Sequence, residues 1–127
     1  SDRTFIGAFQ QIDTAIVGPF LLIFFFGPLI LTILAGALHL GQEERSMLPW
    51  IGIAFSLQLA IFAITLVINV PLNNGIKAAG NPDTIDDISA VRQRFNEAKW
   101  AGWNLFRSVT STVSVACLAW ALVLIER

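Results

Sequence analysis

The sequence predicts an all-α membrane protein, a bundle of three transmembrane helices. Apolar residues make up 55% of the chain and charged residues only 13%, far from the composition of an average soluble protein. Each of three apolar runs, 14–38, 49–70 and 101–125, is long enough to cross about 30 Å of hydrocarbon and holds almost no charge. We therefore expect an integral membrane protein whose helices contact lipid.

The first helix is predicted over about residues 4–40. Apolar side chains recur at helical spacing from Phe5 to Ile16, and the pattern runs directly into the first apolar run. Pro19 and Pro28 each follow a glycine, and each removes a backbone donor. We expect kinks at both positions, which membrane helices tolerate when neighbouring groups bind the freed carbonyls.

The second helix is predicted over about residues 49–70. A short polar turn over 41–48 precedes it, so the first two helices should be antiparallel neighbours. The helix should end near Asn69, because Val70 precedes Pro71 and the residue before a proline is disfavoured in the α conformation. The glycines and prolines that follow predict an irregular loop over 71–84.

The third helix is predicted over about residues 85–125. Thr84, followed three residues later by Asp87, is typical of a helix N-terminus. An unbroken helix of this length would measure about 60 Å, roughly twice the hydrocarbon thickness. Its first half must therefore project from the membrane, or the helix must break near Gly102.

The distribution of cationic residues predicts the orientation in the membrane. The N-terminus and the segment 71–100 share one side of the predicted bundle, and cations gather on that side: Arg3, Lys77, Arg92, Arg94 and Lys99, against Arg45 and Arg127 on the other. Positive residues favour the cytoplasmic side. We expect a bacterial inner-membrane protein with the segment 71–100 in the cytoplasm.

A stripe of polar and aromatic side chains follows one face of the third helix. At 100° per residue, seven of them fall within about a third of the helix circumference: Asn96, Trp100, Trp103, Asn104, Arg107, Ser111 and Ser114. Arg107 lies about two turns inside the apolar run, where an unpartnered cation costs on the order of 2–3 kcal/mol or more. We expect Arg107 to face the interior of the bundle.

The topology brings polar residues of all three helices toward one side, where they can line a pocket. The predicted pocket residues are Gln10, Asp13, Asn69, Asn73, Asn74, Trp100, Trp103, Asn104 and Arg107. Amides, indoles and one cation suit a flat, partly anionic aromatic or quinone-like molecule. The alternative is that the amides hydrogen-bond one helix to another and that the tryptophans lie at the membrane interface.

Several classes of function do not fit this sequence. A net charge of −1 leaves no basic surface for nucleic acid. The single histidine, His39, is predicted at the far end of the first helix, about 35 Å from Asp13 by helical rise. The single cysteine, Cys117, lies in the middle of the third run. These residues predict no metal ligand set, no haem site and no catalytic triad, so we expect no cofactor.

Two motifs are similar to those of the anthrone oxygenase-like family of small membrane proteins. They are NVPLNNGI at 69–76 and WAGWNLFR at 100–107; FIGAFQQIDTAI at 5–16 and GPF at 18–20 also resemble the segment before that family's second membrane helix. The resemblance implies a four-helix bundle of which this chain would hold the last three helices. The chain differs from the family at Asp13 and Gly18, where asparagine is common. The motif positions implied are Asn69, Pro71, Asn73, Trp103, Asn104 and Arg107.

The resemblance also implies an activity. Named members of the family oxidise anthrones to anthraquinones with molecular oxygen and without an evident metal or flavin. In such a reaction the catalytic residues would be Arg107, stabilising an oxyanion, and Asp13, acting as a base. The competing expectation is a non-catalytic accessory subunit, whose apolar faces are covered by partners in a larger membrane protein complex.

Overall fold

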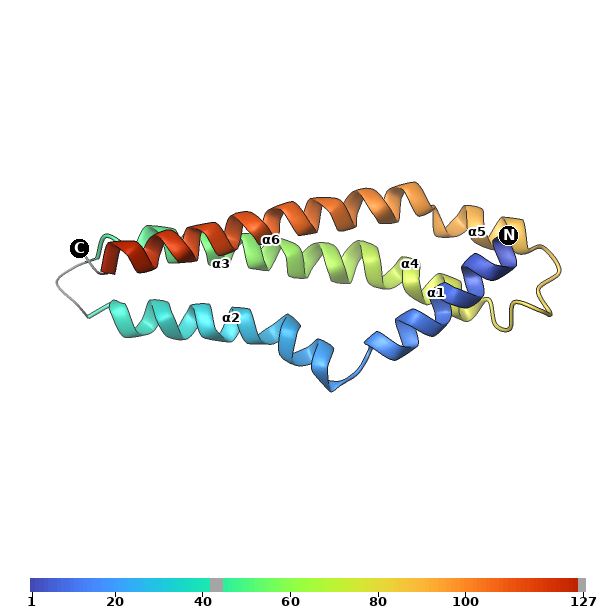
Figure 1. The fold of residues 1–127 in the computed structure, drawn as a ribbon, viewed down its shortest axis with the longest axis horizontal. Helices are drawn as coiled ribbons and strands as arrows, with labels where there is room; N and C mark the ends of the chain where they lie inside the picture. Colours follow the sequence, from blue (N-terminus) through green and yellow to red (C-terminus); the bar gives the residue numbers. More distant parts are fainter. Residues whose placement is uncertain (42–44, 126–127) are drawn as a thin grey trace.

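The protein, seen in a computed structural model that describes residues 1–41 and 45–125, has the all-α fold that the sequence predicts. The described ranges are helical with no strand. Three long helices run alongside one another: α2 (Pro19–His39), α3 (Leu48–Ile64) and α6 (Glu97–Ile125) (Figure 1). Among the described residues, three stretches are long and apolar enough to span a membrane: Leu21–His39, Leu48–Ala78 and Ile88–Ile125.

The prediction of one helix over 4–40 is wrong, because the helix is interrupted before Pro19. A separate helix, α1, covers Asp2–Ile16, and both Val17 (ψ 90°) and Gly18 (φ −155°, ψ −176°) are extended. Pro19 disfavours the α conformation of the residue before it and starts α2 in its first turn. Figure 1 shows α1 turned away from the line of α2. Pro28, in contrast, lies inside α2, which continues on both sides of it.

The predicted end of the second helix at Asn69, and with it the first part of the loop predicted over 71–84, is also wrong. A π-helical turn, η1 (Thr65–Asn69), follows α3 and leads directly into α4 (Val70–Ala78). Val70 keeps the α conformation (φ −61°, ψ −46°), and its N–H bonds the carbonyl of Thr65. The wider π turn accommodates the ring of Pro71, which would clash with the carbonyl of the preceding turn in a regular helix.

The predicted third helix, 85–125, is also divided in two. α5 covers Ile88–Phe95, so it begins later than predicted, and its cap is Asp87, whose Oδ1 accepts from the Ala90 N–H at 3.0 Å. That hydrogen bond is the main cause of the lowered pKa of the Asp87 carboxyl. The break lies at Asn96, which has a left-handed conformation (φ 52°), and not near Gly102. The helix bends here because asparagine adopts this conformation more readily than most residues.

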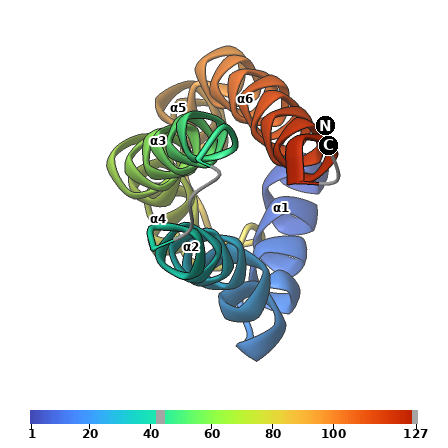
Figure 2. The ribbon, with the colours of Figure 1, turned by 90° about the vertical axis from the view of Figure 1, so that its left-hand side faces the viewer.

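Helix α3 organises the long part of the molecule, because it packs against both α2 and α6 (Figure 2). Buried Met47, Ile51 and Ala121 form a small core near the end of α6. The predicted turn over 41–48 also lies at this end, and its residues 42–44 are outside the described part of the chain, as is Arg127. α6 runs antiparallel to α3, so α6 also packs against η1, and its Trp100 reaches Asn73 of α4.

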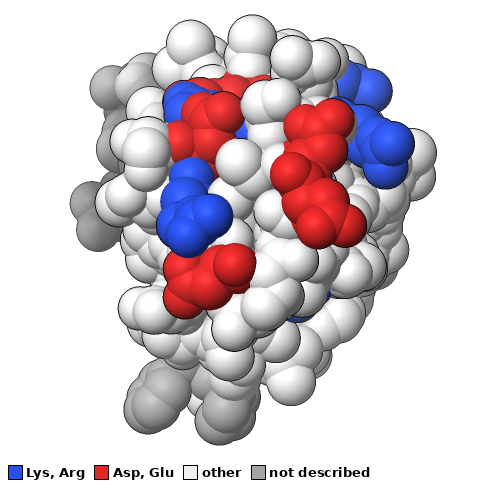
Figure 3. Space-filling model, turned by 90° about the vertical axis from the view of Figure 1, so that its right-hand side faces the viewer, with Lys and Arg blue, Asp and Glu red and all other residues white. Residues whose placement is uncertain are grey.

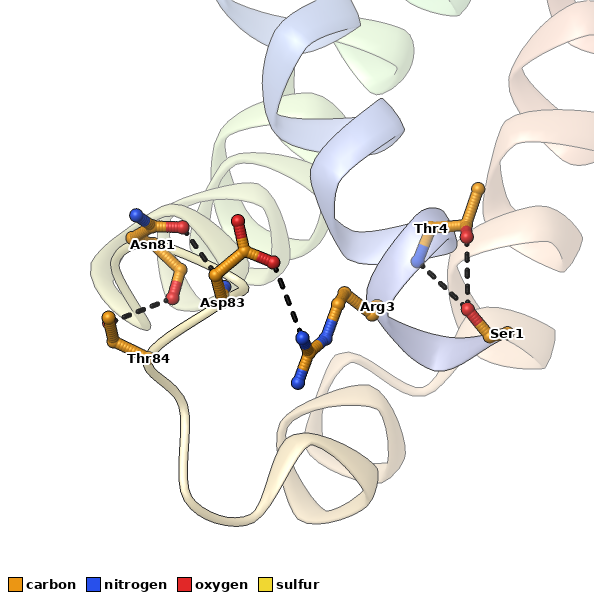
Figure 4. Close-up of polar contacts among 6 residues, drawn as sticks. All are labelled: Ser1, Arg3, Thr4, Asn81, Asp83 and Thr84. Atoms are coloured by element: carbon orange, nitrogen blue, oxygen red, sulfur yellow. Dashed lines mark hydrogen bonds and ion pairs between the residues drawn. The ribbon is translucent and has the colours of Figure 1, made fainter.

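The opposite end of the molecule holds α1, α4 and α5 (Figure 1). Buried Ile6, Ile76 and Phe95 join these three helices in a second core. Charged side chains gather on the surface of this end (Figure 3). Ion pairs at this end join separate elements. Arg92 pairs with Asp2 and with Glu97, each at 2.8 Å. Arg3 pairs with Asp83 at 3.4 Å, and this pair connects α1 to the loop after α4 (Figure 4).

The turn at Asn96 makes a prediction about stability. The Asn96 Oδ1 accepts from the Lys99 N–H at 3.1 Å, so the residue both turns the chain and caps α6. Asn96→Ala should lower the free energy of unfolding by about 1–2 kcal/mol, since it loses the cap and strains the backbone. Asn96→Gly should cost less than half as much, because glycine adopts the left-handed conformation freely. Unfolding in mixed detergent measures both, and an equal loss in the two variants would contradict this role.

Candidate functional site

Asp13, Asn73 and Trp100, three of the predicted pocket residues, are joined by hydrogen bonds between α1, α4 and α6. The Asn73 Nδ2 donates to the Asp13 Oδ1 at 2.7 Å, and the indole N–H of Trp100 donates to the Asn73 Oδ1 at 2.9 Å. The ammonium of Lys77 lies 2.8 Å from the Asp13 Oδ2, and only 10% of the Asp13 side chain is exposed. The Asp13 Oδ1 therefore accepts a hydrogen bond from α4, whereas Oδ2 is in an ion pair with Lys77 and has no hydrogen bond of good geometry among the described residues.

The same line of contacts continues along α6 to Arg107. The Asn104 Nδ2 donates to the backbone carbonyl of Trp100 at 2.8 Å, and the Arg107 guanidinium donates to the Asn104 Oδ1 at 3.1 Å. Five predicted site residues thus belong to one chain of contacts, which leads from the polar end of the molecule into its apolar part: Asp13, Asn73, Trp100, Asn104 and Arg107.

Gln10, also predicted for the pocket, instead completes the end of α4. Its Nε2 donates to the carbonyls of Ile76 at 2.8 Å and Gly80 at 3.0 Å. The last carbonyls of a helix have no partner within it, so this side chain satisfies groups that would otherwise be left open. The contact holds α1 against α4.

A cavity of about 470 Å³ lies among the three long helices, at the end of this line of contacts. Its lining is aromatic and apolar on α2 and polar on α6: Phe24, Phe25, Pro28, Leu29, Gln58, Ile61, Phe62, Asn104, Arg107, Ser108 and Ser111. The rings of Phe25 and Phe62 stack with their centroids 4.9 Å apart. Arg107 therefore faces the interior, as expected for a cation in an apolar span.

Gln58 is a member of this cavity that the predicted site did not include. Its Nε2 donates to the hydroxyl oxygens of Thr32 at 3.0 Å and Ser114 at 3.3 Å, so it joins α2, α3 and α6. The available signal was one amide in the middle of the apolar run 49–70, since polar residues inside membrane spans usually face the bundle interior. Gln58 Oε1 and Arg107 Nε are buried and have no hydrogen-bond partner among the described residues.

The other three predicted residues do not line the cavity and make no hydrogen bond to the residues above. Asn69, in η1, is 3% exposed, and neither atom of its amide has a partner within the described ranges. Asn74 is exposed on α4. Trp103 packs edge-on against Phe106, with ring centroids 5.8 Å apart. The structure thus brings together five of the nine predicted pocket residues, and a role in binding or catalysis remains a prediction for all of them.

His39 and Cys117 lie away from this site. The His39 Nδ1 is 2.7 Å from the carbonyl of Ala35 in its own helix, and Cys117 is buried in α6. Within the part of the chain that the structure describes, no three side chains of histidine, cysteine, aspartate or glutamate are grouped to hold a metal ion.

The comparison with protein families supports the assignment that the motifs suggest. The model of the anthrone oxygenase family matches residues 20–117. The chain belongs to this family. In this anthrone oxygenase family member the match includes every residue that lines the cavity, whereas α1, with Asp13, lies before it. No curated protein and no solved structure matches the chain.

The cavity of this anthrone oxygenase family member is suited to charge stabilisation. A cation acts more strongly on a nearby anion in a region of low dielectric constant than it does in water. The arrangement thus places one cation beside a wall of phenylalanine rings, where it can stabilise a negative charge. The described residues that line the cavity include no Asp, Glu or His, so the lining itself holds no general base.

The contacts of Asp13 generate a second prediction. Asp13→Ala leaves the Asn73 amide without its acceptor and should lower the free energy of unfolding by about 1–3 kcal/mol. Asp13→Asn keeps an acceptor and should cost less, because the ion pair that it loses involves the partly exposed Lys77. Asp83→Asn, which removes an exposed ion pair, is the control and should change little. A loss in Asp13→Asn as large as that in Asp13→Ala would contradict this account.

Proposed function

We propose that this protein binds a flat aromatic ketone of the anthrone class in the cavity and oxidises it to a quinone with molecular oxygen, without a metal or flavin. The observation that carries the proposal is the position of Arg107 beside Phe24, Phe25 and Phe62 in a cavity of about 470 Å³. Ligand pockets commonly have volumes of this order and combine apolar walls with a few polar groups. Membership in the anthrone oxygenase family supports the substrate class.

The chemistry needs one molecule of oxygen and little from the protein. Loss of a methylene proton from the anthrone gives an enolate, and Arg107 stabilises the charge on its oxygen. Oxygen then adds at the former methylene carbon and a proton returns, giving a hydroperoxide. Loss of water from the hydroperoxide leaves the second carbonyl. Each quinone formed thus consumes one oxygen molecule and releases one water molecule.

We assign Asp13 a positioning role in place of the catalytic base that was expected. Its carboxylate is engaged by Asn73 and Lys77, and it does not line the cavity. Through Asn73 and Trp100 it supports the start of α6, which carries Asn104 and Arg107. The methylene proton then leaves to water, since charge stabilisation by Arg107 makes the substrate more acidic.

Substitution of Arg107 tests the proposed activity. Arg107→Ala should lower the rate of anthrone oxidation by about 10²–10³-fold, the usual effect of losing one oxyanion donor. Arg107→Lys should lose less, because it keeps the charge without the planar fork. The rate is measured as oxygen consumption and quinone formation by protein in lipid nanodiscs, with helical content followed by circular dichroism.

The matched control for this test is Arg94→Ala, which removes an arginine from outside the cavity and should keep the wild-type rate. If wild-type protein neither binds anthrone nor consumes oxygen with it, the proposed function fails. If Arg107→Ala keeps the full rate, the cavity is not the site of reaction.

A second candidate function is that of an accessory subunit in a larger membrane protein complex. The observation in its favour is the exposure of apolar side chains on α2 outside the cavity, where Leu31 is 66% and Leu38 73% exposed. Lipid or partner helices could cover them. Extraction in mild detergent distinguishes the two, because an accessory subunit would purify with other proteins at a fixed stoichiometry.

We propose, finally, that the segment 71–100 faces the cytoplasm of a bacterial inner membrane. In a Cys117→Ala background, Ser46→Cys should react with a membrane-impermeant maleimide in cells whose outer membrane is permeable. Asn81→Cys should react only after the inner membrane is opened, because it lies at the end with most of the cations. The reverse pattern of labelling would overturn the orientation.

A further inference from the structure

We infer that Gln58 determines substrate specificity, because it lines the cavity and its Oε1, an acceptor without a donor among the described residues, can accept a hydrogen bond from a hydroxyl group of the bound ketone. The inference rests on the proposed function, which places an anthrone-class molecule in the cavity that Gln58 lines. It concerns a different group of the ligand from the one that Arg107 would bind.

The hydrogen bonds around Gln58 fix which way its amide faces. Thr32 donates its hydroxyl proton to the carbonyl of Pro28 at 2.7 Å, and Ser114 donates its own to the carbonyl of Ala54 at 3.2 Å. Both hydroxyl oxygens can therefore only accept from Gln58. The NH₂ group must lie on their side, at 3.0 and 3.3 Å, and Oε1 must point elsewhere.

The Gln58 Oε1 is therefore an acceptor without a hydrogen-bond donor in the described part of the chain. It is buried in the middle of an apolar span. A buried polar group without a partner is unfavourable, so a donor that reaches this oxygen gains free energy. Gln58 lines the cavity, but Oε1 itself has almost no accessible surface, so a donor in the cavity reaches it when the amide shifts toward the ligand.

A second residue that lines the cavity, Arg107, has a hydrogen-bond donor without a partner among the described residues. Arg107 Nε, on α6, is a buried donor without a partner in the described ranges, whereas Gln58 Oε1, on α3, is an acceptor. A ligand that fits both has an oxygen that accepts from Arg107 and, separately, a hydroxyl that donates to Gln58. Sites built to bind a substrate hydroxyl discriminate strongly against analogues that lack it.

A trapped water molecule could also supply the missing donor, and Gln58 could serve only to hold three helices together. Neither role distinguishes a ligand with a hydroxyl from one without. The ratio of two affinities therefore isolates the proposed role from both.

The experiment compares two probes, anthrone and a monohydroxyanthrone whose hydroxyl lies on an outer ring away from the ketone. Dissociation constants are measured by quenching of tryptophan fluorescence in nanodiscs, without oxygen so that no turnover occurs. Wild-type protein should bind the hydroxyanthrone about tenfold more tightly. Gln58→Leu should bring the ratio close to one by weakening only the hydroxyanthrone.

Gln58→Met, closer in shape to glutamine, repeats the test in case the leucine variant does not fold. Ser56→Ala is the matched control and should keep the wild-type ratio. Ser56 is on the same helix, but its hydroxyl donates to the backbone carbonyl of Gly52 and it does not line the cavity. Equal affinity of the wild type for both probes, or a preference that survives substitution of Gln58, overturns the inference and leaves the proposed function intact. Failure of the wild type to bind either probe overturns the proposed function itself.

Discussion

Polar side chains inside an apolar span must find their partners within the protein, and this constraint fixes how α6 lies against α3. The Ser114 hydroxyl bonds the carbonyl of Ala54, and Gln58 bonds Ser114 in turn. Lipid offers no hydrogen bonds, so a rotation of α6 that exposed these groups would leave several of them unsatisfied. With α6 held in this orientation, Arg107 faces the space between the helices rather than the lipid.

The polar residues of the molecule serve two different purposes. At one end, Asp13, Asn73 and Lys77 engage one another, and Trp100 packs edge-on against Phe9 with centroids 5.5 Å apart. The hydrogen bonds of Asn73 join α1, α4 and α6 at this end. The cavity is different, because two of the residues that line it, Gln58 and Arg107, each keep a buried atom without a hydrogen-bond partner among the described residues. Binding is expected where polar groups are left open, and not where they are already paired.

The sequence was sufficient for the parts of the fold that depend on composition and chain direction. Three apolar runs predicted the spans, and their order correctly placed Asp13, Asn73 and Trp100 at the same end. Arg107 had to face inward because an exposed cation in hydrocarbon is costly. The contact of Asp13 with Asn73 also agrees in part with the alternative of amides that hold helices together.

The remaining features depend on tertiary contacts that no local pattern contains. Pro19 and Pro71 have the same local effect on the residue before them. The helix is interrupted before Pro19, yet it continues through Pro71. The difference comes from η1, which widens the turn before Pro71. Gln58 escaped prediction because a single amide in an apolar run shows a buried position, but not the two hydroxyls that orient it.

The π-helical turn has a consequence for how this chain tolerates insertions and deletions. A π turn contains one residue more than the α turn that it replaces, so removal of any one residue from Thr65–Asn69 would restore a regular helix. Both turns complete about the same rotation, so the residues after such a deletion would keep their faces relative to α3, and Asn73 and Lys77 would still lie toward Asp13. A deletion inside the regular helix α3 would instead rotate everything after it by about 100°. The π turn is thus a place in this helix where the chain can change in length by one residue while the polar end keeps its orientation relative to the cavity.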